Sequence, residues 1–168
     1  VFMKTDLTKR VIFIMGVSGS GKTSVGRLLA NELSVPFIDA DDHHPPSNIE
    51  KMSQEIPLID SDRKPQLDQL NEIAVDHVSY GCVIVCSALK AVYRKRLVQS
   101  IESNVLWVYL KGSYDLIFER IKNREDHFMG AEMLKSQFEI LEEPENAINI
   151  DIADSPEVIV QKIKSHLK

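Results

Sequence analysis

The chain has 168 residues, 43% of them hydrophobic and 27% charged, a composition that suits one globular domain spanning residues 1–168. Its 20 Lys and Arg residues against 25 Asp and Glu residues give a net charge of −5, which excludes the broad basic surface that binds nucleic acids or anionic membranes. No apolar run approaches the roughly 20 residues that span a bilayer, so we expect a cytoplasmic protein without a membrane segment.

Strand-like and helix-like segments alternate along the chain. Five short apolar runs are typical of strands buried on both faces of a parallel sheet, and they cover residues 11–15, 35–38, 82–86, 105–110 and 147–152. Between these runs apolar residues recur at helical spacing, and helix starts are indicated by a capping-box pattern from Ser47 to Glu50 and by Ser155 before Pro156. The alternation predicts a doubly wound, three-layer α/β fold whose ligands bind beyond the carboxyl ends of the strands.

The first apolar run leads directly into a glycine-rich segment that fits the phosphate-loop pattern G-x-x-x-x-G-K-[ST] at every fixed position. Glycine lets consecutive backbone N–H groups converge on phosphate oxygens, and the following helix N-terminus adds a favourable partial charge. We expect Lys22 to reach the β- and γ-phosphates of ATP and Thr23 to bind Mg²⁺. The predicted nucleotide-binding residues of this loop are Gly16, Val17, Ser18, Gly19, Ser20, Gly21, Lys22 and Thr23.

The phosphate loop alone leaves open whether the protein transfers phosphate to a small molecule, hydrolyses it as a switch, or drives motion. Residues 123–126 read Asn-Arg-Glu-Asp and so lack the lysine of the guanine-reading sequence Asn-Lys-x-Asp, which argues against a GTPase switch. A sensor that binds ATP and a ligand without transferring phosphate is a further alternative. Such a sensor predicts ATP binding with no phosphorylated product.

Acidic and histidine residues follow the second predicted strand. In an extended segment Asp39 and Asp41 point to the same side, so one can hold Mg²⁺ through its water shell while the other deprotonates an attacking hydroxyl. A metal site built from residues 41–44 is a competing interpretation, although adjacent residues cannot all converge on one ion. Lys51 lies on the next predicted helix, where it either meets an anionic substrate or is a solvated surface lysine.

Together with the phosphate loop, several segments resemble the gluconokinase family of P-loop kinases, in order along nearly the whole chain. They are Asp39-Ala-Asp-Asp42, His44-Pro45, Asn48-Ile-Glu-Lys-Met52, Pro57-Leu58, Asp60-Ser-Asp-Arg63, Cys86-Ser-Ala-Leu-Lys90, Tyr93-Arg94 and Arg124-Glu-Asp-His-Phe-Met129. The resemblance implies a nucleoside-kinase-like P-loop fold with a five-stranded parallel sheet, a substrate-binding segment at about residues 41–66 and a short mobile lid at about 124–140. It also implies a homodimer.

The same resemblance implies that ATP, with Mg²⁺, phosphorylates D-gluconate at its terminal hydroxyl to give 6-phosphogluconate. It assigns Asp41 as the base and Asp39 as the acid that holds Mg²⁺ through water. The residues that it places in the sugar-acid pocket are Asp41, His44, Lys51, Arg63 and Ser87. A guanidinium at Arg63 suits the gluconate carboxylate, because it forms two parallel hydrogen bonds, but its spacing equally permits an ion pair with Asp60 or Asp62.

Two arginines four residues apart, Arg120 and Arg124, can share one helix face. The resemblance implies that Arg120 lies against the adenine and that Arg124 closes over the phosphates, where it stabilises charge in the transition state. Without the resemblance both would be solvated residues near a helix C-terminus.

The sequence departs from the family pattern at three positions. Ile59, Gln66 and Asp126 stand where the family commonly has Asn, Trp and Gly. Two of these positions flank the proposed substrate arginine. Another polyhydroxy acid, such as shikimate, is therefore the alternative acceptor.

Overall fold

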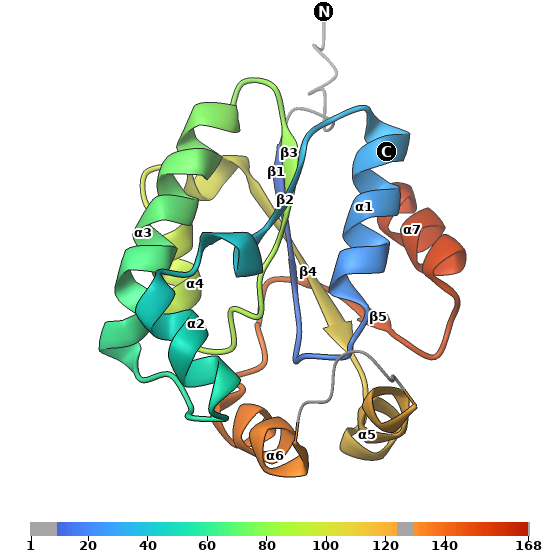
Figure 1. The fold of residues 1–168 in the computed structure, drawn as a ribbon. Helices are drawn as coiled ribbons and strands as arrows, with labels where there is room; N and C mark the ends of the chain where they lie inside the picture. Colours follow the sequence, from blue (N-terminus) through green and yellow to red (C-terminus); the bar gives the residue numbers. More distant parts are fainter. Residues whose placement is uncertain (1–9, 124–129, 168) are drawn as a thin grey trace, which may run out of the picture.

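A parallel five-stranded sheet forms the centre of the computed structural model, which describes residues 10–123 and 130–167 (Figure 1). The strand order is β2-β3-β1-β4-β5, so β1 is the middle strand, and every pairing is parallel. The strands are β1 Val11–Met15, β2 Phe37–Asp39, β3 Cys82–Val85, β4 Val105–Lys111 and β5 Ile148–Asp151. The predicted five-stranded parallel sheet is confirmed. Strand β2 begins later than predicted because Pro36, which has no N–H to donate to a neighbouring strand, immediately precedes it.

Helices alternate with the strands along the chain. The α-helices are α1 Lys22–Leu33, α2 Pro46–Ser53, α3 Asp60–His77, α4 Ala91–Leu97, α5 Tyr114–Lys122, α6 Ala131–Ile140 and α7 Pro156–Ser165, and the 3-10 turns are η1 Ala40–His43 and η2 Glu102–Asn104. Ser155 caps α7 as predicted, since its side chain accepts a hydrogen bond from the Val158 N–H. The predicted capping box is wrong: Ser47 lies inside α2, which begins at Pro46. Proline favours the first helical position, where its fixed φ fits and its missing N–H costs nothing.

The sheet is covered on both faces, which makes the three predicted layers (Figure 1). Side chains alternate along β1, so Phe13 and Met15 pack with α3 and α4 while Ile12 and Ile14 pack with α1 and α7. All five residues of β1 are buried, and Phe13 stacks on Trp107 of β4 at a centroid distance of 4.7 Å. This packing fixes the position of the loop that leaves the carboxyl end of β1. No helix in residues 10–123 and 130–167 is long and apolar enough to cross a membrane.

The two cysteines are buried within and just after β3, and neither forms a disulfide. Burial raises the pKa of Cys82 to about 12 and that of Cys86 to about 11, which keeps both as neutral, unreactive thiols near neutral pH. We expect neither cysteine to react with a disulfide reagent such as DTNB at pH 8 in the folded protein, and both to react in denaturant. Rapid labelling of the native protein would contradict this prediction.

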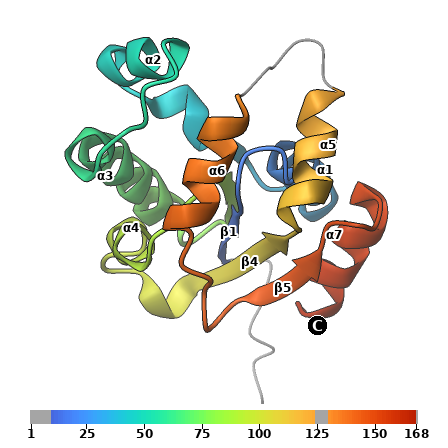
Figure 2. The same cartoon turned by 90° about the horizontal axis from the view of Figure 1, so that it is seen from below.

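At the carboxyl end of the sheet, the phosphate loop, η1, α2 and α6 contribute residues to one cavity. Figure 2, which views the molecule from this end, shows α6 lying between α3 and α5. Helix α6 packs against α5, which precedes it in the chain, and also lines a cavity together with residues from 41–93. The site predicted from the sequence therefore lies where this fold class binds its ligands.

Candidate functional site

The loop between β1 and α1 has backbone conformations that require glycine. Gly21 is the N-cap of α1 and has φ +94°, and Gly19 has φ +83°. A Cβ on Gly19 would also lie 2.7 Å from Cγ1 of Ile121 on α5, so this glycine is required both by its φ and by close packing. The loop is thereby pressed against α5, and its turn leads directly into the N-terminus of α1, which favours anionic ligands.

The two glycines offer a matched test of this geometry. Gly19→Ala is expected to lower the melting temperature by several degrees and to weaken nucleotide binding, because it adds a steric clash to a cost of about 1–2 kcal/mol for positive φ. Gly21→Ala meets nothing within 4 Å, so only the φ cost applies and the loss of stability should be smaller. Thermal melts of both variants check the order. An equal or larger loss in Gly21→Ala would contradict the packing argument.

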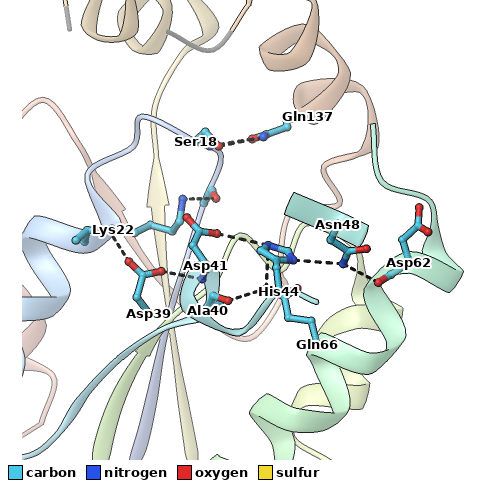
Figure 3. Close-up of polar contacts among 12 residues, drawn as sticks. Ser18, Lys22, Asp39, Ala40, Asp41, His44, Asn48, Asp62, Gln66 and Gln137 are labelled. Atoms are coloured by element: carbon cyan, nitrogen blue, oxygen red, sulfur yellow. Dashed lines mark hydrogen bonds and ion pairs between the residues drawn. The ribbon is translucent and has the colours of Figure 1, made fainter. Parts of the chain in front are cut away.

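Lys22, the first residue of α1, extends back across the loop. Its Nζ donates hydrogen bonds to the carbonyl oxygens of Gly16 and Val17, each at 3.0 Å (Figure 3). The ammonium group therefore lies on the face of the loop to which backbone N–H groups bring phosphate oxygens in proteins of this type. The buried Ser20 hydroxyl has no hydrogen-bond partner among the described residues.

Two acidic residues stand at the end of β2, but the geometry differs from the predicted extended segment. Asp39 ends the strand, and one of its oxygens accepts from the Asp41 N–H at 2.9 Å. The other accepts from the Thr23 hydroxyl at 3.3 Å. Asp41 thus lies in the 3-10 turn η1 rather than in a strand, because Asp39 caps that turn. Asp39 therefore links the Thr23 hydroxyl to the backbone of Asp41 through two hydrogen bonds.

The Asp41 carboxylate is exposed and lies close to His44, with 3.7 Å between Oδ1 and Nε2. The contact with His44 is the largest cause of a pKa for Asp41 below its usual range, and the positive charge of Lys22 acts in the same direction. Asp41 is therefore ionised at neutral pH. An ionised carboxylate beside the phosphate loop can accept a proton from a hydroxyl.

A buried amide network fixes His44. Gln66 donates from Nε2 to the Ala40 carbonyl at 2.8 Å and lies 3.0 Å from His44 Nε2. Asn48 donates to the Asp62 carbonyl at 2.8 Å and lies 3.4 Å from His44 Nδ1 (Figure 3). Asn48 and Gln66 are both fully buried, so the histidine is held between two amides from α2 and α3. Sequence reasoning treated Gln66 only as a departure from a family pattern and missed this role.

A cavity of about 620 Å³ opens beside the phosphate loop. It gathers five of the predicted site residues, namely Ser18, Asp41, His44, Arg63 and Ser87. Lys90 and Tyr93, and Met133, Ser136 and Gln137 of α6, also line it. One side of the cavity is thus the phosphate loop, and its other walls carry cationic and hydroxyl side chains.

Arg63 reaches this cavity with an unsatisfied donor. Its Nε is buried and has no hydrogen-bond partner among the described residues, while its guanidinium lies 5.3 Å from the centre of the Tyr93 ring. Arg63 forms an ion pair with neither Asp60 nor Asp62, the two acids that its spacing in the sequence permits. Asp62 pairs with Lys51 at 2.9 Å, and Asp60 pairs with Lys90 at 3.0 Å and accepts from the Tyr93 hydroxyl. Arg63 thus lines the cavity without an ion pair to either acid, and a guanidinium in that position is suited to an anionic ligand.

Other predicted residues lie elsewhere. Lys51 is bound to Asp62, lowers the pKa of that carboxyl, and does not belong to the cavity lining. Arg120 donates to the Ile152 carbonyl, at the connection between β5 and α7. Arg124 and Asp126 lie outside the described residues. Asp62 is already engaged as a cap at the start of α3, where it accepts from the Ile59 N–H, and this places it within reach of Lys51.

The alternative metal site at residues 41–44 is wrong. Within residues 10–123 and 130–167, no group of three or more His, Cys, Asp or Glu side chains could hold a metal ion. The turn η1 directs Asp41 toward His44 and the cavity, and the other two side chains beside the His44 ring are the amides of Asn48 and Gln66. The oxygens of Thr23 and Asp39, in contrast, form a small hard donor set beside the phosphate loop.

Comparison with known proteins extends over most of the chain. A family model described as shikimate kinase matches residues 18–168. The chain is 41% identical to a probable gluconokinase of Dictyostelium discoideum, over 95% of this chain and 87% of the relative. It is 42% identical to the thermoresistant gluconokinase of Escherichia coli K12, over 98% of this chain and 90% of the relative. A solved structure of a gluconokinase from Sinorhizobium meliloti matches with a TM-score of 0.88 and 40% identity, over 95% of this chain and 92% of that chain.

The regions of similarity include the phosphate loop from Ser18 onward, the turn with its two acids, and the cavity. Sequence identity of this level over nearly the full length accompanies a shared fold, and the solved gluconokinase structure has that fold. With this match to several relatives and to the shikimate kinase family model, the chain belongs to the gluconokinase family of P-loop kinases.

Proposed function

We propose that this protein is a gluconokinase, which transfers the terminal phosphoryl group of ATP to the terminal hydroxyl of D-gluconate and releases ADP and 6-phospho-D-gluconate. The observation that carries the proposal is the cavity beside the phosphate loop, with the buried, unpartnered Nε of Arg63 in its wall. The named gluconokinases of similar sequence support the choice of acceptor, and the kinase family implies the use of ATP.

The acceptor is proposed to enter with its carboxylate at Arg63 and its terminal hydroxyl at Asp41. Both residues line the cavity, as do His44 and Ser87, which offer hydrogen bonds to the hydroxyls of the sugar chain. A guanidinium binds a carboxylate through two parallel charge-assisted hydrogen bonds, which a neutral polyol cannot form. The proposed role of Lys51 changes with its geometry: paired with Asp62, it holds α2 against α3 and supports the cavity wall without lining it.

Chemistry at the terminal hydroxyl follows from the position of Asp41. The hydroxyl oxygen forms a bond to the γ-phosphorus while the bond from that phosphorus to the ADP oxygen breaks, and the hydroxyl proton passes to the Asp41 carboxylate. Lys22 and the loop N–H groups hold the phosphates and neutralise their charge. The positive charge of Lys22 also lowers the pKa of Asp41, the proposed base.

Thr23 and Asp39 would hold Mg²⁺, the hydroxyl directly and the carboxylate through water, because their oxygens lie 3.3 Å apart at the edge of the phosphate loop. When bound, the ion neutralises charge on the phosphate oxygens. Asp39 also accepts from the Asp41 N–H, so the residue proposed for the ion positions the base as well.

Two arginines complete the proposed donor site. Helix α5 packs against the phosphate loop through Ile121, next to Arg120, which supports a position for Arg120 near the adenine. We propose that residues 124–140 form a lid over the substrates and that Arg124, outside the described residues, supplies positive charge to the transferred phosphoryl group. The whole chain is proposed to act as one kinase domain.

A coupled assay of ADP release over a panel of sugar acids tests the proposal. D-Gluconate should be phosphorylated in preference to shikimate and to other polyhydroxy acids. Preference for another acid would identify a different kinase, and Ile59, exposed in the cavity wall, would be the first residue to examine for it. Tight ATP binding with no phosphorylated product by mass spectrometry would instead identify a sensor.

The family resemblance also supports a homodimer. A cytoplasmic location is proposed because ATP is the phosphoryl donor and the two buried cysteines form no disulfide. Light scattering of the purified protein at several concentrations tests the oligomeric state. A mass that stays at the monomer value throughout would contradict the dimer.

A further inference from the structure

One side chain of α6 binds the phosphate loop at two points. The Oε1 of Gln137 accepts from the backbone N–H of Ser18 at 2.8 Å, and its Nε2 donates to the Ser18 hydroxyl at 3.0 Å (Figure 3). The oxygen and the nitrogen of the Gln137 carboxamide thus both form hydrogen bonds with Ser18. Met133, Ser136 and Ile140, which share this face of α6, line the cavity beside it.

This contact stands where the loop opens into the acceptor cavity. Ser18 is the third residue of the loop, and it lines the same cavity as Asp41 and Arg63. Backbone N–H groups of such a loop are the donors offered to phosphate oxygens. In this structure the Gln137 oxygen accepts the hydrogen bond from the Ser18 N–H that a phosphate oxygen would otherwise accept.

We propose that Gln137 is a positioning residue for the terminal phosphoryl group, an inference that rests on the proposed kinase function. A phosphate oxygen that takes the Ser18 N–H cannot lie beside the Gln137 oxygen, because both are acceptors. The carboxamide then turns over and donates from Nε2 to the phosphoryl oxygen. Its two unlike ends let Gln137 hold α6 on the loop both before and after the nucleotide arrives.

The substitution Gln137→Glu separates this role from a purely structural one. A carboxylate has the same shape and accepts from both the N–H and the hydroxyl of Ser18, so α6 stays on the loop and the protein stays folded. The glutamate has no N–H to donate to the phosphoryl group, however, and its negative charge repels that group. Gln137→Leu removes both abilities without adding charge.

The nucleotide provides the decisive comparison, because ADP lacks the terminal phosphoryl group. In Gln137→Glu, calorimetry should show affinity for ADP within about twofold of the unchanged protein, and affinity for a non-hydrolysable ATP analogue lower by about tenfold or more. Gln137→Leu should lose less of the analogue affinity than Gln137→Glu. Gln99→Glu, the same exchange at an exposed position near the end of α4, should change neither affinity.

A structural tether predicts the opposite order, with Gln137→Glu equal to the unchanged protein and Gln137→Leu the poorest binder and the least stable variant in thermal melts. That order, or equal losses for ADP and the analogue, would overturn the proposal. Since the comparison uses binding of nucleotides alone, it does not depend on which acceptor is phosphorylated. A failure of the gluconate assay and a failure of this inference are therefore distinguishable.

Discussion

Asp41→Asn is expected to lower kcat with D-gluconate by about 10²- to 10⁴-fold, the range of a general base, while ATP affinity changes little. Asparagine keeps the shape of the side chain and can still lie beside His44, but it cannot take a proton near neutral pH. Because the pKa of Asp41 is already held below its usual range, the unchanged enzyme has this base ionised throughout the neutral range. Steady-state kinetics with gluconate and calorimetry with an ATP analogue measure the two effects separately.

Asp42→Asn is the matched control, because Asp42 is the next residue of η1, is exposed, and does not line the cavity. It removes the same charge within one residue of Asp41 and should leave kcat within about twofold. Near-normal turnover in Asp41→Asn would remove this residue from the role of base. Equal losses in both variants would point to a general effect of negative charge near the phosphate loop.

Arg63→Lys is expected to raise the KM for D-gluconate by about 10- to 100-fold with a smaller change in kcat, since the interaction lies far along the acceptor from the reacting hydroxyl. Lysine keeps the charge but loses the planar fork, the buried Nε donor and the contact with the Tyr93 ring. A neutral polyol of the same length should be a poor substrate for the unchanged enzyme. The preference for gluconate over that polyol should fall in the variant, and rates with both compounds measure it.

Arg96→Lys serves as the control, because Arg96 lies on α4 but pairs with Asp68 and does not line the cavity. It should leave the KM for gluconate unchanged within about twofold. A KM that does not rise in Arg63→Lys would mean that the carboxylate binds elsewhere. Lys90, which lines the same cavity, would then be the next cation to test.

The sequence was sufficient to predict the sheet and the phosphate loop because their signals are local. A strand buried on both faces must be apolar throughout, as Val11–Met15 is, and a loop with two left-handed residues needs glycines at fixed spacing. The position of Asp41 was predicted with the wrong local structure. Alternation along an extended segment assumed that β2 continues, whereas Asp39 caps the 3-10 turn that ends it.

The partners of the polar side chains could not be predicted, because each depends on residues far apart in the chain. Whether Lys51 is free or paired is decided by Asp62, which the start of α3 brings beside α2. Gln66 reaches Ala40 and His44 across the same junction. The contact between Gln137 and Ser18 spans 119 positions, and a glutamine on an amphipathic helix gives no local sign of it.

The lining of the cavity has a further consequence for how such enzymes diverge. Apart from Ser18 and the residues of α6, every lining residue comes from the stretch between Asp41 and Tyr93, whereas the nucleotide is assigned to residues 16–23 and α5. The proposed sites for the two substrates thus come from separate stretches of the chain, which lie side by side at the carboxyl end of the sheet. Exchange of residues 41–93 between two kinases of this fold should carry the choice of acceptor with it and leave the donor unchanged, so new acceptors can arise by recombination without loss of ATP binding.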